Sequence, residues 1–170
     1  MKDKNFLHSS FREKLIEHLF IGELLKLDWR KGDCQLEIAR SEVDNGGSDI
    51  IAEANGVIRH IQLKSMRKGG TAKSQNVNLK LADKPSGCVV WIVLDDETAE
   101  LGPFYFFGGE AGMPLPDISR GKPAKNTRGN SLGEKAERPN IRKVGRARFT
   151  CLESLDDVYR VLFLPACEDP

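Results

Sequence analysis

Apolar side chains recur at helical spacing near the start of the chain and predict a helix over residues 9–27. The recurring positions are Phe11, Leu15, Leu19, Phe20, Ile21, Leu24 and Leu25. Ser10 and Glu13 have the spacing of a capping box, which indicates that the helix begins at this point. A helix is therefore expected ahead of the first strand.

Alternating apolar and polar positions predict strands in the middle of the chain. The expected strands are residues 34–40, 49–54, 57–64, 88–94 and 104–107. Asn55-Gly56, between the second and third of them, is the strongest short signal for a hairpin turn. The run from Cys88 to Leu94 is apolar throughout, which is typical of a central strand covered on both faces.

Two further segments complete the predicted architecture. Residues 71–83 alternate in polarity like a strand, but a short helix fits them as well. A last helix is expected from Ser154 to Phe163, with Ser154 as its cap. This order of elements predicts a single α/β or α+β domain over residues 1–170, with a mixed sheet flanked by helices.

Composition excludes some classes of protein. Apolar residues make up 39% of the 170 residues, which is enough for one core, and the formal net charge is +1. Because the chain starts with a charged segment and has no apolar run of membrane-spanning length, we expect a soluble cytoplasmic protein without membrane association. Cys34, Cys88, Cys151 and Cys167 form no Cys-x-x-Cys pair, so reduced thiols in or near the core are expected rather than a zinc or redox motif.

Positive charge is concentrated in a loop-rich segment, residues 110–148. From Arg120 to Arg148 there are ten Lys or Arg residues and two Glu, which gives a local net charge of +8. Such a segment can bind a phosphate backbone, but a solvated loop has the same composition. The candidates for nucleic-acid contacts are Lys122, Lys125, Arg128, Arg142, Lys143 and Arg146. Trp29 and Trp91 are expected in the core rather than as base-stacking platforms.

The predicted hairpin brings three polar side chains together. With a two-residue turn at Asn55-Gly56, the register puts Asp49 directly opposite Gln62. Lys64 lies two residues beyond Gln62 and projects from the same face of the sheet. A carboxylate, an amide oxygen and an ammonium group are thus expected at the open end of the hairpin.

These three groups suit the hydrolysis of a phosphodiester. Mg²⁺ (or Mn²⁺) prefers oxygen ligands and often needs only one or two protein carboxylates. The bound ion can polarise a phosphoryl oxygen and acidify a bound water. A neighbouring ammonium group can orient the attacking water or offset developing negative charge. The three groups therefore suit metal-dependent hydrolysis of a phosphodiester, and the resemblance of these residues to a nuclease family implies a nuclease with DNA as its substrate.

The same residues resemble the core of a known group of enzymes. Gly47-Ser48-Asp49-Ile50-Ile51, then a turn and Ile61-Gln62-Leu63-Lys64-Ser65, resembles the PD-(D/E)XK nuclease (restriction endonuclease-like) superfamily. This superfamily includes restriction endonucleases, Holliday-junction resolvases and many uncharacterised bacterial proteins. The resemblance implies an αβββαβ core over residues 9 to about 94, provided that residues 71–83 are helical. It also implies a role in DNA repair, recombination or defence.

The resemblance implies roles for individual residues as well. Asp49 corresponds to the metal-binding aspartate and Lys64 to the catalytic lysine. Gln62 stands where most members have Asp or Glu, so the chain resembles the Gln-x-Lys variants, whose neutral amide is a weaker ligand. Many members carry a further glutamate on the first helix, and Glu17 is the candidate here. The implied site consists of Asp49, Gln62 and Glu17 around the metal ion, with Lys64 beside it.

Other interpretations of these residues stay open from the sequence. Asp49 also suits a turn, and Gln62 and Lys64 also suit the solvated side of an amphipathic strand. His60 is expected on the Asp49 face, where it could act as an acid or base or simply pack. The chain could accordingly be an inactive nuclease-fold protein that binds nucleic acid or a protein partner. It could also work only with a partner enzyme, or form a homodimer.

Overall fold

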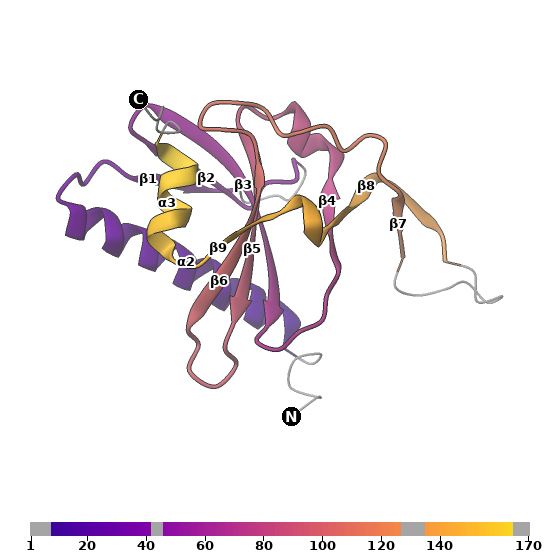
Figure 1. Ribbon diagram of the computed structural model, residues 1–170, viewed down its shortest axis with the longest axis horizontal. Coiled ribbons are helices and arrows are strands. Elements are labelled where there is room, and N and C mark those ends of the chain that lie inside the picture. Colours follow the sequence, from indigo (N-terminus) through magenta and orange to yellow (C-terminus); the bar gives the residue numbers. More distant parts are fainter. Residues whose placement is uncertain (1–7, 42–45, 127–134, 165–170) are drawn as a thin grey trace.

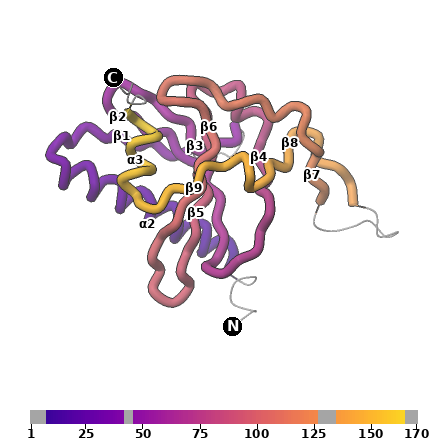
Figure 2. Tube along the Cα trace, viewed as in Figure 1, coloured from indigo at the N-terminus to yellow at the C-terminus, as the bar shows by residue number. Residues whose placement is uncertain are grey.

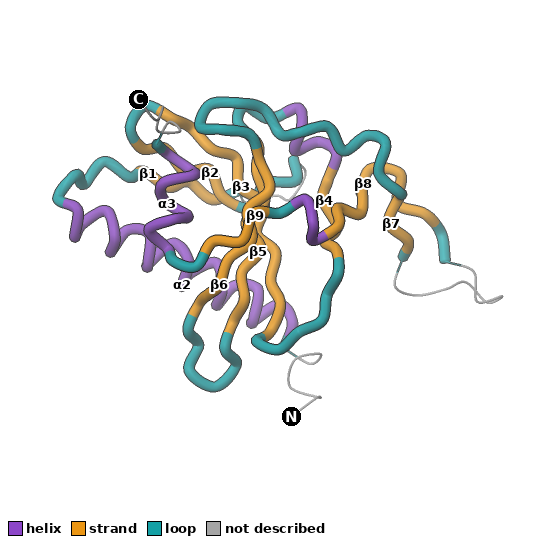
Figure 3. Tube along the Cα trace, in the orientation of Figure 1, coloured by secondary structure: helices purple, strands orange, loops and turns teal. Residues whose placement is uncertain are grey.

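The computed structural model describes residues 8–41, 46–126 and 135–164, which form a mixed α+β fold (Figure 3). The elements in chain order are α2 (Ser9–Lys31), β1 (Glu37–Arg40), β2 (Ile50–Ala54), β3 (Val57–Arg67), β4 (Ser74–Asn78), the 3₁₀ helix η1 (Leu79–Asp83), β5 (Gly87–Leu94), β6 (Leu101–Gly108), β7 (Pro123–Lys125), β8 (Glu137–Gly145), the 3₁₀ helix η2 (Arg146–Arg148), β9 (Thr150–Leu152) and α3 (Leu155–Phe163).

The elements form three layers, and the middle layer is a six-stranded sheet with the strand order β1-β2-β3-β5-β6-β9. The β3–β5 pair is parallel, whereas the other neighbouring strands are antiparallel. Helices α2 and α3 pack on one face, and a three-stranded sheet, β4-β8-β7, packs with η1 on the other (Figure 1). Figure 2 shows the chain running from β8 through β9 to α3, so this segment joins the outer layers.

Each face of the large sheet has its own apolar core. On the helical side, Phe20 of α2 and Leu162 of α3 pack with Ile61 of β3. On the side of the small sheet, Val77 of β4 packs with Trp91 of β5. Every residue of β5 is buried, which confirms that this apolar run is a central strand covered on both faces.

Helix α2 differs from its prediction at both ends. It begins after His8 without a side-chain cap, so the capping box predicted for Ser10 and Glu13 is wrong. It continues to Lys31 and ends at Gly32, which adopts the left-handed conformation (φ 83°) that favours glycine. Trp29, near this end, is 76% exposed and not in the core, because it lies on the face of α2 that points away from the sheet.

The segment between β3 and β5 is the main departure from the αβββαβ order. Residues 74–78 form strand β4, and only the following five residues form the short 3₁₀ helix η1. Strand β4 pairs with β8, which lies in the segment predicted to be loop-rich. The structure therefore matches the predicted mixed α+β class, and a restriction endonuclease-like core stays an expectation.

A buried arginine joins the hairpin to the C-terminal helix. Arg59 is fully buried, and its guanidinium donates to the carbonyl oxygens of Leu162 (2.8 Å), Val161 (2.8 Å) and Gly109 (3.1 Å). The first two carbonyls end α3, where the helix dipole favours a cation. Burial lowers the pKa of Arg59 from its ordinary value. Arg59 thus fixes α3 against the sheet.

A second buried contact joins α2 to α3. The Tyr159 hydroxyl donates to Asp28 Oδ1 (2.9 Å), and the Leu36 main-chain N–H donates to Asp28 Oδ2 (3.0 Å). Asp28 is buried away from water, and these two hydrogen bonds give each of its carboxylate oxygens a partner. One carboxylate therefore holds α2, α3 and the chain leading into β1 together.

Stability is expected to fall as the pH rises above about 9. Burial raises the pKa of Cys88 to about 12, and burial together with the Asp28 contact raises that of Tyr159 to about 12. The unfolded chain loses these protons near its ordinary values of 9.0 and 10.0, whereas the folded protein keeps them. The neutral Cys88 thiol thus contributes about 4 kcal/mol and the neutral Tyr159 hydroxyl about 3 kcal/mol of stability that is present at neutral pH and lost by about pH 12.

Urea unfolding between pH 7.5 and 11 measures this effect. The variants Cys88→Ala and Tyr159→Phe should each lose less stability over this range than the wild type, although both start from a lower value. Equal pH slopes for all three proteins would show that neither group causes the loss.

No described helix is long and apolar enough to cross a membrane. Cys88 is buried as expected, whereas Cys34 and Cys151 are exposed free thiols. The expected location in or near the core is therefore wrong for these two, and Cys167 lies outside the described residues.

Candidate metal and nucleic-acid site

The hairpin register confirms most of the predicted pairing. Strands β2 and β3 pair from Ile50–Ile61 to Ala54–Val57, as a tight Asn55-Gly56 turn requires. The His60 position lies opposite Ile51 as expected, and its ring Nδ1 lies 2.8 Å from the Pro85 carbonyl oxygen. That contact at the base of β5 favours a structural role for the imidazole.

Asp49 stands one residue before the paired part of β2, not in the strand itself. Its main-chain N–H donates to the Ile61 carbonyl (2.9 Å), and its Oδ2 accepts from the Leu63 N–H (2.6 Å). The carboxylate thus takes the place of a main-chain carbonyl at the end of the ladder. Because Leu63 separates Gln62 from Lys64, the carboxylate lies against β3 between these two residues.

Gln62 and Lys64 are on the face of β3 that points away from the helices. In the β3–β5 register, Gln62 pairs with Val89 and Lys64 with Trp91. Val89 and Trp91 both belong to the apolar core between the large and the small sheet. Gln62 is only 7% exposed, and its Oε1 accepts from the Asn78 main-chain N–H (3.4 Å). The solvated alternative is therefore wrong for Gln62, whereas Lys64 is half-buried.

Two glycines bring the loop before Asp49 close to β4 and η1. Gly47 has φ 76°, and a Cβ there would lie 2.7 Å from the Asn78 Cβ, so only glycine fits. A Cβ on Gly46 would lie 2.9 Å from Lys84 Cε and 3.1 Å from its Nζ. Lys84 and Asn78 thus border the candidate site. Neither residue could be predicted from the sequence, since the glycine pair indicated only a turn.

Glu17 is held by cations on the helical side of the sheet. Its carboxylate lies 2.8 Å from Lys14 Nζ and 2.6 Å from Arg40 Nε, and the residue is buried. Gln62 and Lys64 point to the opposite face. A metal ion bound by Glu17 would therefore have to compete with Arg40 and Lys14.

The predicted nucleic-acid residues differ in how far their charges are available. Lys122, Lys125 and Lys143 are exposed on or beside the small sheet. Arg142 is half-buried and donates to the carbonyls of Ser119 (3.2 Å) and Pro139 (2.6 Å), among others.

Arg146 is exposed but already has aromatic partners. Its guanidinium lies 4.4 Å from the ring centre of Tyr105 and donates to the hydroxyl of that residue. Arg128 lies outside the described residues. Among the predicted nucleic-acid residues that the structure describes, the three lysines and Arg146 are therefore exposed and Arg142 is half-buried.

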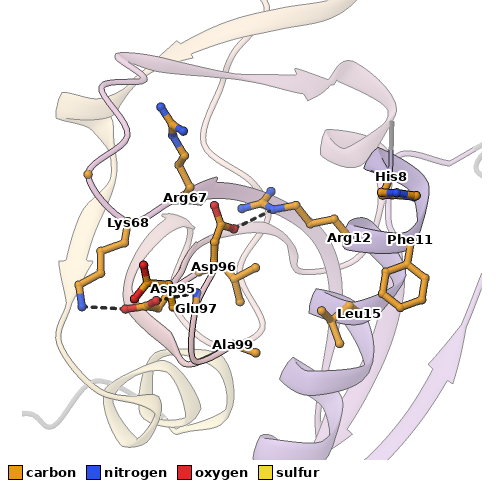
Figure 4. Close-up of a pocket in the computed structure, with 12 residues that line it drawn as sticks. His8, Phe11, Arg12, Leu15, Arg67, Lys68, Asp95, Asp96, Glu97 and Ala99 are labelled. Atoms are coloured by element: carbon orange, nitrogen blue, oxygen red, sulfur yellow. Dashed lines mark hydrogen bonds and ion pairs between the residues drawn. The ribbon is translucent and has the colours of Figure 1, made fainter. Parts of the chain in front are cut away.

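A groove of about 1020 Å³ lies elsewhere, between the start of α2 and the β5–β6 turn (Figure 4). Four of its charged residues form ion pairs: Lys68 Nζ contacts Asp95 Oδ2 (2.9 Å), and the Arg12 guanidinium bridges Ser65 Oγ (3.0 Å) and Asp96 (3.5 Å). The Lys68 hydrogen bond lowers the pKa of Asp95. None of the residues predicted for the metal site lines this groove.

The acidic and metal-binding side chains of residues 8–41, 46–126 and 135–164 are dispersed. Within these ranges, no three His, Cys, Asp or Glu side chains gather closely enough to hold a metal ion. A site here would depend on Asp49, the Gln62 amide oxygen and water, a donor set that suits Mg²⁺ better than Zn²⁺.

No protein-family model matches the sequence, and no curated protein is significantly similar to it.

Proposed function

We propose that the protein is a metal-dependent nuclease that hydrolyses phosphodiester bonds, with DNA as its substrate. The observation that carries this proposal is the contact between Asp49 Oδ2 and the Leu63 N–H at 2.6 Å. It fixes a carboxylate at the β3 main chain between Gln62 and Lys64. The Gln62 amide oxygen and the Lys64 ammonium group of β3 are thus combined with the carboxylate of Asp49, which directly precedes β2.

The donor set fits a Mg²⁺ or Mn²⁺ ion. Asp49 would supply the carboxylate and Gln62 the amide oxygen, and water would complete the shell. When bound, the ion supplies charge stabilisation at the phosphoryl group and a more acidic water. We include Glu17 as a third ligand only in a rearranged state, because its carboxylate contacts Arg40 in this structure.

The surrounding residues would bind and orient the substrate. Lys64 is half-buried, so its ammonium group is less screened than a surface charge and can hold water or offset charge on the phosphate. Lys84, beside the glycine loop, would contact a neighbouring phosphate. Lys122, Lys125 and Lys143 would hold the backbone farther away through salt-dependent contacts.

A second candidate is an inactive relative of such an enzyme that binds nucleic acid or a protein partner. This candidate is favoured because two oxygen atoms of the proposed site already accept hydrogen bonds from the main chain. Gln62 Oε1 accepts from Asn78, and Asp49 Oδ2 accepts from Leu63. Both side chains would be retained in a protein that needs them only to hold β2, β3 and β4 together.

Cleavage of plasmid and single-stranded DNA, with Mg²⁺, Mn²⁺ or EDTA, distinguishes the two functions. The wild type should cut only with metal. Gln62→Glu should bind Mg²⁺ more tightly and cut faster, by about tenfold, because a second carboxylate replaces a neutral amide. The glutamate can still accept from Asn78, so the fold should persist.

Isothermal titration of Mg²⁺ into both proteins provides a measurement that does not depend on substrate choice. Gln75→Glu, on strand β4 of the small sheet, is the charge-matched control and should leave Mg²⁺ affinity unchanged. Absence of metal binding and of cleavage in both the wild type and Gln62→Glu would reject the nuclease and favour the binding protein.

A further inference from the structure

Helix α2 has a second apolar stripe on the side that points away from the sheet. The apolar side chains of the stripe are Phe11, Leu15, Leu25 and Trp29, with the exposed His18 and Gly22 between them, and the six positions follow each other in alternating steps of four and three residues. This is the spacing of a helix that packs along another helix. The core-facing residues Ile16, Phe20, Leu24 and Leu27 occupy the opposite side.

Most of the stripe is open to solvent in the described structure, whereas Leu15 is half-buried and lines the groove of Figure 4 together with Phe11. Trp29 is 76% exposed, Phe11 71% and Leu25 44%, and they are half of the exposed large apolar residues among those described. A Cβ placed on Gly22 would have no atom within 4 Å. A helix that is apolar on both sides is normally covered on both sides. The outer face of α2 is therefore an uncovered packing surface.

The stripe is complementary to itself when two copies run antiparallel. The positions then pair so that their numbers sum to 40: Phe11 with Trp29, Leu15 with Leu25, and His18 with Gly22. Each large ring meets a ring, and each His18 fills the gap left by a glycine. A parallel arrangement would set gap against gap at Gly22. Antiparallel helices also bring opposite ends of their dipoles together.

The area is sufficient for a weak but specific dimer. Rings of this kind bury 150–250 Å², so at 71% and 76% exposure Phe11 and Trp29 offer roughly 100–190 Å² each. Two copies contribute four such rings, or roughly 400–750 Å². The leucines and the stems of Lys14 and Lys26 bring the total to about 1,000 Å², the lower bound for a specific interface.

We propose that the protein forms a homodimer through antiparallel packing of the outer faces of α2 around Gly22. This interaction is independent of the proposed nuclease activity. Its expected dissociation constant is in the micromolar range, given the small interface.

Sedimentation velocity of the full chain, from about 1 to 200 µM, tests the proposal. The wild type should shift from monomer to dimer over this range. Leu25→Glu should weaken the dimer at least tenfold, because it buries a charge in the interface. Ile58→Glu is the matched control, since Ile58 is also 44% exposed but lies on β3, and it should dimerise like the wild type. Circular dichroism checks that both variants are folded.

Disulfide crosslinking tests the antiparallel register, in a background where the three cysteines other than Cys88 are serine. A mixture of Leu15→Cys and Leu25→Cys chains should crosslink, whereas either variant alone should not. Crosslinking of Leu25→Cys alone would overturn the antiparallel arrangement. A wild type that stays monomeric, or a Leu25→Glu variant that dimerises like Ile58→Glu, would overturn the homodimer and assign this face to a different partner.

Discussion

Replacing Lys64 with alanine is expected to reduce metal-dependent cleavage of DNA by about 10²–10³-fold, the usual effect of removing one charge-stabilising group from an active site. The loss should appear in kcat, because the ammonium group acts on charge that develops during the reaction. Mg²⁺ affinity should change little, since Lys64 is not a ligand in the proposed site. Cleavage rates at saturating DNA and metal measure the effect.

Asp49→Asn is expected to differ from Lys64→Ala in its effect on Mg²⁺ binding. The asparagine oxygen can still accept from the Leu63 N–H, so the end of the hairpin is preserved while the negative charge is removed. We expect loss of both Mg²⁺ binding and cleavage with little change in the melting temperature.

Lys68→Ala is the control, because Lys68 follows the same strand but forms only an exposed ion pair with Asp95. It should cleave like the wild type. Cleavage by folded Lys64→Ala at the rate of this control would show that the activity, if any, lies elsewhere.

Arg59→Leu is expected to lower the free energy of unfolding by about 3–5 kcal/mol. The variant removes the donors for the buried carbonyl of Leu162 and the partly buried carbonyls of Val161 and Gly109. In a chain of this size the loss corresponds to a drop in melting temperature of roughly 10 °C. Urea unfolding at neutral pH gives the value directly.

Two further variants test whether the loss depends on the buried position of Arg59 and on the shape of its guanidinium group. Arg67→Leu, at the exposed end of the same strand, should change stability by less than about 0.5 kcal/mol. Arg59→Lys keeps a cation but not the planar fork and should fall between the two. An Arg59→Leu protein as stable as Arg67→Leu would mean that α3 is held by its apolar contacts alone.

The sequence predicted the parts of the fold that depend on local chemistry. The Asn55-Gly56 turn determined the hairpin register, and Ser154 capped α3 as expected, with Asp157 completing the capping box. The apolar run of β5 could belong only to a buried strand or helix segment, and its length favoured the strand. In each case a few adjacent residues carry the information.

Features that depend on distant segments could not be predicted in this way. Val77 and Leu81 alternate as if in one element, but Val77 ends up in β4 and Leu81 in η1, because β4 pairs with β8 more than sixty residues later. Strand β8 contains few apolar residues and gave no strand signal. Trp29 could not be assigned to the outer face, because α2 is apolar on both faces.

The candidate site divides in the same way. The relation of Gln62 to Lys64 follows from strand alternation alone, and the position of Asp49 follows from the turn to within one residue. The pairing of Glu17 with Arg40 depends on how α2 lies across β1, and the approach of Lys84 depends on the packing of η1. Neither contact can be predicted from the spacing of residues along the chain.

The contact between Asp28 and Tyr159 spans 131 residues, and its consequence concerns the order of events during synthesis. The ribosome releases α2 and the hairpin long before α3, so a nascent chain has all the residues of the proposed site but not the helix that covers one side of its sheet. Until α3 emerges, Phe20 and Ile61 lack part of their cover. The hairpin is therefore translated early, but its apolar side is fully covered only after α3 has formed.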